Sequence, residues 1–445
     1  MLDENSGELR TVAWSEICPW LVIFRTFRLA VSLRVLLPAA VAILLTAGVW
    51  SVFGAMFASN SEATQWTQPF VNSAWMATTE VVPEYEHPQL PDAAAVNLIP
   101  VTDNPVLAAW SQLMHPLWGV FQPDATAWDL ICLLLCGLAS LAIWAFFGGA
   151  ITRIAAVQLA GGEQISLPAA LRFACSKWPA FFIAPLVPLL GVAFAALPVW
   201  IIGLLLNANL GVLLAAIIWP ILLIIGAAMT LLLLGLIFGW PLMWATISTE
   251  GTDSFDALSR SYAYVFQRPL HYLFYAIVAA LLGILSWLLV SNFAAAVISL
   301  TYWAASFGCG ADRIDNIATG SESLGSIGHA GAALIAFWTG CVKLLAAGFI
   351  YSYFWTAVAA IYLLLRRDAD ATEMDEVYLD EDADEQGYGL PPLGSDEAGA
   401  PVVDDTPTQP PAETQGADVE DADVEDAELD DDQLDDDMRD PSAQR

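Results

Sequence analysis

The chain has 445 residues, of which 57% are hydrophobic and only 14% charged, yet its formal net charge is −33. Soluble domains carry about 45–50% apolar residues, so this composition excludes an ordinary soluble globular protein. The charge is unevenly placed, because 29 of the 48 acidic residues lie from Asp368 onward while 13 of the 15 basic residues come earlier. These numbers predict an integral membrane body followed by an acidic C-terminal tail, with no nucleic-acid partner.

The N-terminal segment, residues 1–34, is predicted to be cytoplasmic and to contain an amphipathic helix at the membrane surface. Its sequence PWLVIFRTFRLAVSLR places Trp20, Phe24, Phe27 and Val31 on one helical stripe. Residues 35–57 follow as the first span. This run exceeds the 7–15 residues typical of a signal-peptide core, so we expect an uncleaved signal anchor.

Residues 58–126 contain no Lys or Arg, which predicts an extracytoplasmic loop. Within this loop, PVLAAWSQLMHPLWGVF is apolar enough to lie back on the outer face of the membrane. Residues 127–366 then form a region with five more spans. These are predicted at 128–150, 180–206, 210–240, 271–300 and 340–365.

Several small features qualify these spans. Asn207, Asn209 and Gly211 indicate a tight hairpin between the third and fourth. Gly235 and Gly239 form a GxxxG pattern suited to close helix packing. The Gly- and Ser-rich segment 320–331 is predicted to be a flexible connector. Four prolines are candidate kinks or span ends, namely Pro185, Pro188, Pro220 and Pro241.

Basic residues set the predicted orientation. They cluster before span one, between spans two and three, between spans four and five, and after span six, whereas the opposite loops have Arg313 alone. Because short cytoplasmic loops are enriched in Lys and Arg, both termini are predicted to be cytoplasmic. The expected location is a cell membrane, specifically the bacterial inner membrane.

Two short amphipathic segments, near 163–178 and 251–268, are predicted to be elbow helices on the cytoplasmic side. Ser166 and Ser254, each followed by Ala and Arg in the same register, indicate a parallel internal repeat. Ser166 and either Asp253 or Ser254 are candidate N-caps. The apolar stripes are Leu167, Leu171, Ala174 and Trp178 in the first elbow, and Phe255, Leu258, Tyr262 and Val265 in the second.

Long spans joined by a Glu-…-Ser-Phe-x-Ala-…-Arg-Ser elbow resemble the membrane domains of some bacterial glycerophosphoryl diester phosphodiesterases. The resemblance covers about residues 128–300. The sequence shows no counterpart of the catalytic domain of those enzymes. The whole chain looks more like an uncharacterised bacterial multi-pass membrane protein family.

Chemistry-bearing motifs are scarce. The sequence lacks a P-loop, an H-E-x-x-H pattern and a complete G-x-S-x-G pattern. The six cysteines show no metal-ligand spacing, and Cys132 and Cys136 are interpreted as small buried hydrophobes. We therefore expect neither catalysis nor a cofactor or metal.

Five basic residues are candidate contacts for lipid or for a partner: Arg172, Lys177, Arg260, Arg268 and Lys343. The alternative is that the first four only set topology and anchor the elbows. Lys343 is better explained by a side chain that extends to the outer interface, and a substrate or lipid-headgroup contact is the alternative.

The tail, residues 367–445, is predicted to be disordered and cytoplasmic because it is polar and densely acidic. Two apolar islands interrupt it and form a candidate docking motif, made of Val377, Tyr378 and Leu379, and of Tyr388, Leu390, Pro391, Pro392 and Leu393.

These features favour a non-enzymatic membrane platform that recruits or regulates a cytoplasmic partner through the tail. The alternative hypothesis is a transporter or lipid-handling permease. Beyond the lipid bilayer and such a protein, the sequence names no partner, and it leaves the oligomeric state open.

Overall fold

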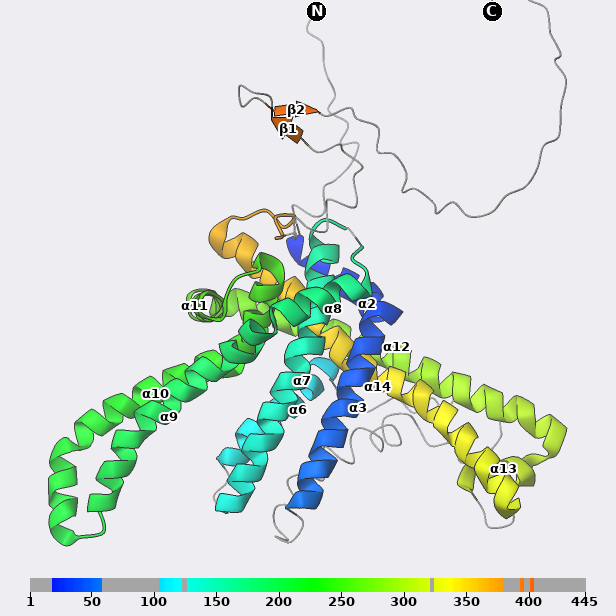
Figure 1. The fold of residues 1–445 in the computed structure, drawn as a ribbon, viewed down its shortest axis with the longest axis horizontal. Helices are drawn as coiled ribbons and strands as arrows, with labels where there is room; N and C mark the ends of the chain where they lie inside the picture. The colour runs from blue at the N-terminus through cyan, green and yellow to red at the C-terminus, as the bar shows by residue number, and fades with distance from the viewer. Residues whose placement is uncertain are drawn as a thin grey trace, which may run out of the picture. The chain divides into compact units, whose positions relative to one another are not determined.

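The computed structural model describes residues 18–57, 104–121, 126–162, 164–320 and 324–378, together with two short strands between residues 393 and 403. The chain divides into two compact units, Met1–Leu379 and Asp380–Arg445. The described part of the first unit is built from helices alone (Figure 1). The protein is an all-α integral membrane protein, as its composition predicts.

Six helices of the described residues are long and apolar enough to cross a membrane. They are α3 (Leu33–Met56), α7 (Ala127–Ala160), α9 (Trp178–Leu205), α10 (Asn209–Glu250), α12 (Pro269–Cys309) and α14 (Gly325–Asp370). Each predicted span overlaps one of them, so the six-span prediction is confirmed. Shorter helices flank the spans, namely η1 (Pro19–Leu21), α2 (Val22–Ala30), α6 (Pro105–Val120), α8 (Leu167–Ser176), α11 (Ser254–Gln267) and α13 (Ala311–Thr319).

The helices α9 and α10 form the predicted hairpin and run side by side (Figure 1). The turn between them requires a glycine at position 211, where a Cβ atom would lie 1.8 Å from the carbonyl oxygen of Leu205. The four candidate prolines lie inside these two helices and therefore do not end the spans.

Four spans are longer than hydropathy predicts, because hydropathy locates an apolar window and not the residue at which a helix ends. Helix α10 has 42 residues and is thus roughly 63 Å long, about twice the hydrocarbon thickness. It ends only at Gly251, which has a φ of 65° and caps the helix. The predicted connector at 320–331 is partly wrong, since α14 already begins at Gly325.

The densest packing lies at one end of the spans. From Gly235 to Thr249 most residues of α10 are buried, whereas most of those before Gly235 are exposed and apolar, as a lipid-facing surface requires. At the packed end the rings of Trp244 and Trp355 stack with their centroids 4.6 Å apart. The indole of Trp244 also donates a 2.8 Å hydrogen bond to the carbonyl of Phe181, which joins α9, α10 and α14.

Helix α6 does not lie apart on an outer surface, which corrects the expectation for this segment. Asn104 caps the helix and donates to the carbonyl of Ala280 in α12, and Trp110 donates to that of Ile237 in α10. The hydroxyl of Tyr351 in α14 donates to Gln112. Because these partners belong to three different spans, α6 packs among the spans. The boundaries of the loop that contains it, 58–126, remain a prediction.

The helices α8 and α11 confirm that short helices join the spans at the two expected places. Asp253 caps α11 by accepting a hydrogen bond from the backbone of Asp256, whereas the side chain of Ser166 makes no such bond at α8.

The packing faces of the two elbow helices share residues with the predicted stripes and also include small side chains, which allow the closest approach of two helices. In α11 the predicted Val265 is buried, but so are Ala257 and Ser261, while Phe255 is 64% exposed. In α8 the predicted Ala174 is buried together with Ala170 and Phe173. In α2, Phe24 and Val31 of the predicted stripe are exposed, while Trp20 and Phe27 pack partly buried against the core, and the membrane-surface position of this helix remains a prediction.

The two glycines of the GxxxG pattern face α11. A Cβ atom at Gly235 would lie 2.2 Å from the ring of Tyr262, whereas one at Gly239 would make ordinary contacts with Val265 and Ser261. Within the first unit this pattern therefore serves the packing of an elbow helix on a span.

In the second unit, β1 (Leu393–Ser395) pairs with β2 (Pro401–Val403) as a two-stranded antiparallel sheet. The remaining tail residues from Leu379 onward lie outside the described residues, as does the prediction of disorder for them.

Candidate functional site

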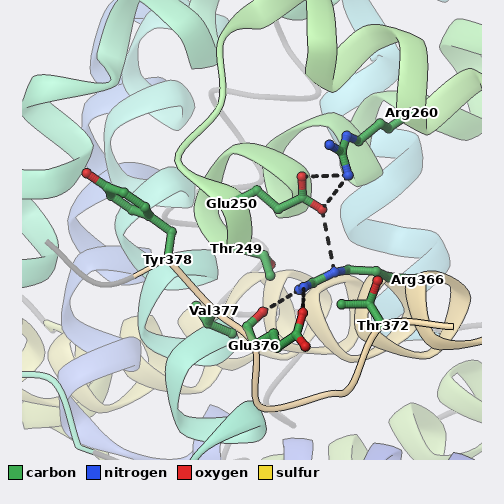
Figure 2. Close-up of a pocket in the computed structure, with 8 residues that line it drawn as sticks. All are labelled: Thr249, Glu250, Arg260, Arg366, Thr372, Glu376, Val377 and Tyr378. Carbon is green, nitrogen blue, oxygen red and sulfur yellow. Dashed lines mark hydrogen bonds and ion pairs between the residues drawn. The ribbon is translucent and has the colours of Figure 1, made fainter. Parts of the chain in front are cut away.

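Polar side chains gather where α10 passes into α11 and where α14 ends. At the centre is Glu250, the last residue of α10, whose side chain is 12% exposed. Figure 2 shows Glu250 between Arg260 of α11 and Arg366 of α14. Arg260 follows Glu250 by ten positions, whereas Arg366 is 116 positions away, and the three residues define what we call the Glu250 site.

The carboxylate of Glu250 has three partners. Its oxygen atoms lie 2.8 and 3.0 Å from Nη1 of Arg260, and the hydroxyl of Tyr362 donates to Oε1 at 2.6 Å. Nε of Arg366 lies 3.6 Å from the same Oε1. Because the side chain of Arg366 is only 9% exposed, the carboxylate stabilises a largely buried cation.

Arg260 also pairs with Asp256 one turn earlier, at 3.2 Å. Burial lowers the pKa of Arg260, but the carboxylates of Glu250 and Asp256 raise it by more, so its net shift is upward. The guanidinium therefore stays charged, as arginine in proteins normally does.

Two tyrosine–aspartate hydrogen bonds attach neighbouring helices to the end of α14. Tyr264 of α11 donates to Asp370, and Tyr275 of α12 donates to Asp368 at 2.6 Å. Burial first, and then the hydrogen bond to Asp370, raise the pKa of Tyr264. The acidic end of α14 is therefore held in place before the tail begins.

The C-terminal carbonyls of α10 are capped by three other parts of the chain. Arg153 of α7 donates to the carbonyl of Ser248 at 2.8 Å, and Lys177 donates to that of Gly251 at 2.5 Å. The backbone N–H of Tyr378 donates to the carbonyl of Thr249 at 2.9 Å. The negative end of the helix dipole thus receives two cations and one backbone donor.

Residues 371–378 run from the end of α14 back to α10. Nη1 of Arg366 donates to the carbonyl of Glu376 at 2.6 Å, and its Nη2 lies 3.7 Å from the carboxylate of Glu376. Together with the Glu250 site, this segment lines an open pocket of about 450 Å³. The pocket is lined by Thr249, Glu250, Arg260, Arg366, Thr372, Glu376, Val377 and Tyr378 (Figure 2).

The five basic residues predicted as contacts do not form one site. Lys177 and Arg260 have the intramolecular partners described above. Arg172 and Arg268 expose their side chains at the elbows. Lys343 is half-buried in α14 and lies 23 residues before Arg366, roughly 35 Å along the helix axis.

Only part of the candidate docking motif of the tail lies within the described residues. Val377 and Tyr378 line the pocket and so contact this chain's own first unit. Leu379, Tyr388, Leu390, Pro391 and Pro392 lie outside the described residues, and Leu393 begins β1.

Sequence reasoning missed Glu250, Arg366 and Arg153 as partners in one region. A usable signal exists for Glu250, because it is an acid directly after a long apolar run and before a Gly. The pairing itself has no sequence signal, since Glu250 and Arg366 are 116 positions apart.

The site binds helices to one another through charge and hydrogen bonds. Across the described ranges, no group of three His, Cys, Asp or Glu side chains is arranged to hold a metal ion. The chain matches no family model, no curated protein and no solved structure.

Proposed function

We propose that this membrane protein is a non-enzymatic platform of the bacterial inner membrane, whose cytoplasmic tail recruits or regulates a basic protein partner. The observation that carries the proposal is the attachment of the tail root. Residues 371–378 are bound to α10 and α14 through Tyr378 and Arg366, so the tail leaves the membrane unit from a defined place.

The charge of the tail supports a basic partner. Residues 380–445 contain 24 acidic and two basic residues. Such a chain segment attracts cationic proteins over distances of about a Debye length and is repelled by anionic lipid. The topology that we propose for the protein places both termini, and therefore the tail, in the cytoplasm.

Two truncations test the recruiting role. A chain that stops after Leu379 keeps the contacts described above for residues 371–378, whereas one that stops after Arg367 loses these residues together with Asp368 and Asp370. Proximity labelling from a tag on the N-terminus should lose basic proteins equally in both truncations. Loss only in the shorter chain would assign the effect to the fold, and an unchanged labelled set in both would refute recruitment.

A second candidate function is a lipid-handling permease. The resemblance to the membrane domains of glycerophosphoryl diester phosphodiesterases motivates this candidate. The packing of α6 among the spans and the apolar surface of α10 before Gly235 favour it. In this alternative Lys343 contacts a substrate or headgroup. Its replacement, Lys343→Met, should then abolish a membrane phenotype at unchanged protein level, and a full phenotype would refute the role of this residue.

A further inference from the structure

We propose that residues 371–378 form a strap that opens and closes on the membrane unit, and that its closure builds the pocket at the Glu250 site. The inference goes beyond the recruiting role and does not rest on it. Four of the eight residues that line the pocket belong to the strap, so the pocket loses one wall whenever the strap leaves.

None of the strap residues 371–378 is buried. Links between the strap and the spans include the N–H of Tyr378 on Thr249, the bond from Arg366 to the carbonyl of Glu376, and a 3.7 Å ion pair whose carboxylate is 65% exposed. Met374 packs against the main core only as a partly buried residue. Segments with so few buried contacts open locally at a small fraction of the global unfolding free energy.

The closed strap also requires an unfavourable backbone conformation. Ala371 has a φ of 53° and is the one residue other than glycine with a positive φ in the described part of the chain. It caps α14 and turns the chain back towards α10. A side chain disfavours this region, so the strap contacts must outweigh a local cost each time the strap closes.

The receiving surface on α10 is shaped for the strap. The ring of Tyr378 lies over Gly251, where a Cβ atom would come within 2.7 Å of it. The hydroxyl of Thr249 is buried, lines the pocket and finds no hydrogen-bond partner among the described residues. Opening exposes this hydroxyl and the Thr249 carbonyl to water, and leaves Arg366 with Glu250 as its acidic partner.

Two substitutions should shift the equilibrium between the open and the closed strap in opposite directions. Ala371→Gly removes the conformational cost of the closed state, so the amides of residues 376–378 should exchange hydrogen roughly fivefold more slowly. Tyr378→Ala removes the ring contact with Gly251, and the same amides should exchange roughly threefold faster or more. Glu373→Gln changes an exposed strap residue and is the matched control, with unchanged exchange expected.

The experiment uses the full chain in lipid nanodiscs and follows exchange by mass spectrometry, with cleavage after Glu376 by a glutamate-specific protease as a second readout. The strap is supported if the two variants act in opposite directions on residues 371–378 while exchange in α10 and α14 stays constant. It is overturned if wild-type residues 376–378 exchange as fast as an unstructured peptide. It is equally overturned if neither variant changes exchange or cleavage.

Discussion

At the scale of single residues, the Glu250 site shows how a short acidic side chain can organise the ends of several membrane helices. Arg366 is 9% exposed at a place where its charge would be costly without a partner. Glu250 lies close enough to serve both Arg366 and Arg260. The contribution of Glu250 to stability depends on the burial of its side chain. The side chain of Asp256, the second carboxylate beside Arg260, is exposed.

Replacement of Glu250 by Gln removes the shared negative charge and keeps the size of the side chain. The variant should lose about 2 kcal/mol of unfolding free energy, less than the roughly 3–5 kcal/mol of a fully buried pair, because Arg260 is 40% exposed. Denaturant unfolding in one fixed detergent measures the difference. Asp256→Asn, which affects an exposed pair, is the control and should cost less than about 1 kcal/mol. Equal losses in the two variants would contradict this ranking.

Tyr264 predicts a dependence of stability on alkaline pH. Its pKa is raised in the folded protein, so above a pH of about 10 the unfolded chain releases this proton first. The stability that Tyr264 contributes is complete below that pH and is lost as the pH rises towards the folded pKa. Thermal unfolding in alkaline buffers should therefore show a steeper fall for the wild type than for Tyr264→Phe. Parallel pH curves would exclude the coupling.

At the scale of elements, the elbows are joints in which small side chains face the spans. Ala257 and Ser261 lie on the buried side of α11, and Gly235 lies beneath Tyr262. The hydroxyl of Tyr262 donates to the carbonyl of Leu232 at 2.7 Å, so ring and backbone are fixed together. The elbow is thus attached to α10 along its length and not only through the connecting residues.

The two glycines under this elbow should respond differently to a methyl group. Gly235→Ala places Cβ against the ring of Tyr262 and should cost about 1–3 kcal/mol of stability. Gly239→Ala meets no atom closer than 3.6 Å and should stay within about 0.5 kcal/mol of the wild type. Unfolding of both variants in the same micelles tests the pair. A larger loss at Gly239 would mean that α11 does not pack on α10 as described.

At the scale of the whole molecule, the native cysteines report orientation. Cys175 in α8 and Cys309 at the end of α12 are exposed, and they lie at opposite ends of the spans. If both termini are cytoplasmic, a membrane-impermeant maleimide should label Cys309 in intact spheroplasts and Cys175 only after permeabilisation. Cys309→Ser and Cys175→Ser each remove one signal and identify the labelled site. The reverse order of labelling would invert the proposed topology.

Hydropathy and charge along the chain were enough to determine the membrane class, the six spans and the two elbow positions. These features depend on the composition of continuous segments, which a sequence displays directly. The ends of α10 and α14 were missed because a cap or a packing partner, and not hydropathy, sets them.

Only the tertiary structure decided which residues act together. It paired Glu250 with Arg366, placed α6 among the spans, and brought Val377 and Tyr378 back to α10. It also added small residues, among them Ala170, Ala257 and Ser261, to the packing faces of the elbow helices. The physical reason is that these arrangements depend on distances in space between side chains, and residues 116 positions apart carry no mark of such a contact in the sequence.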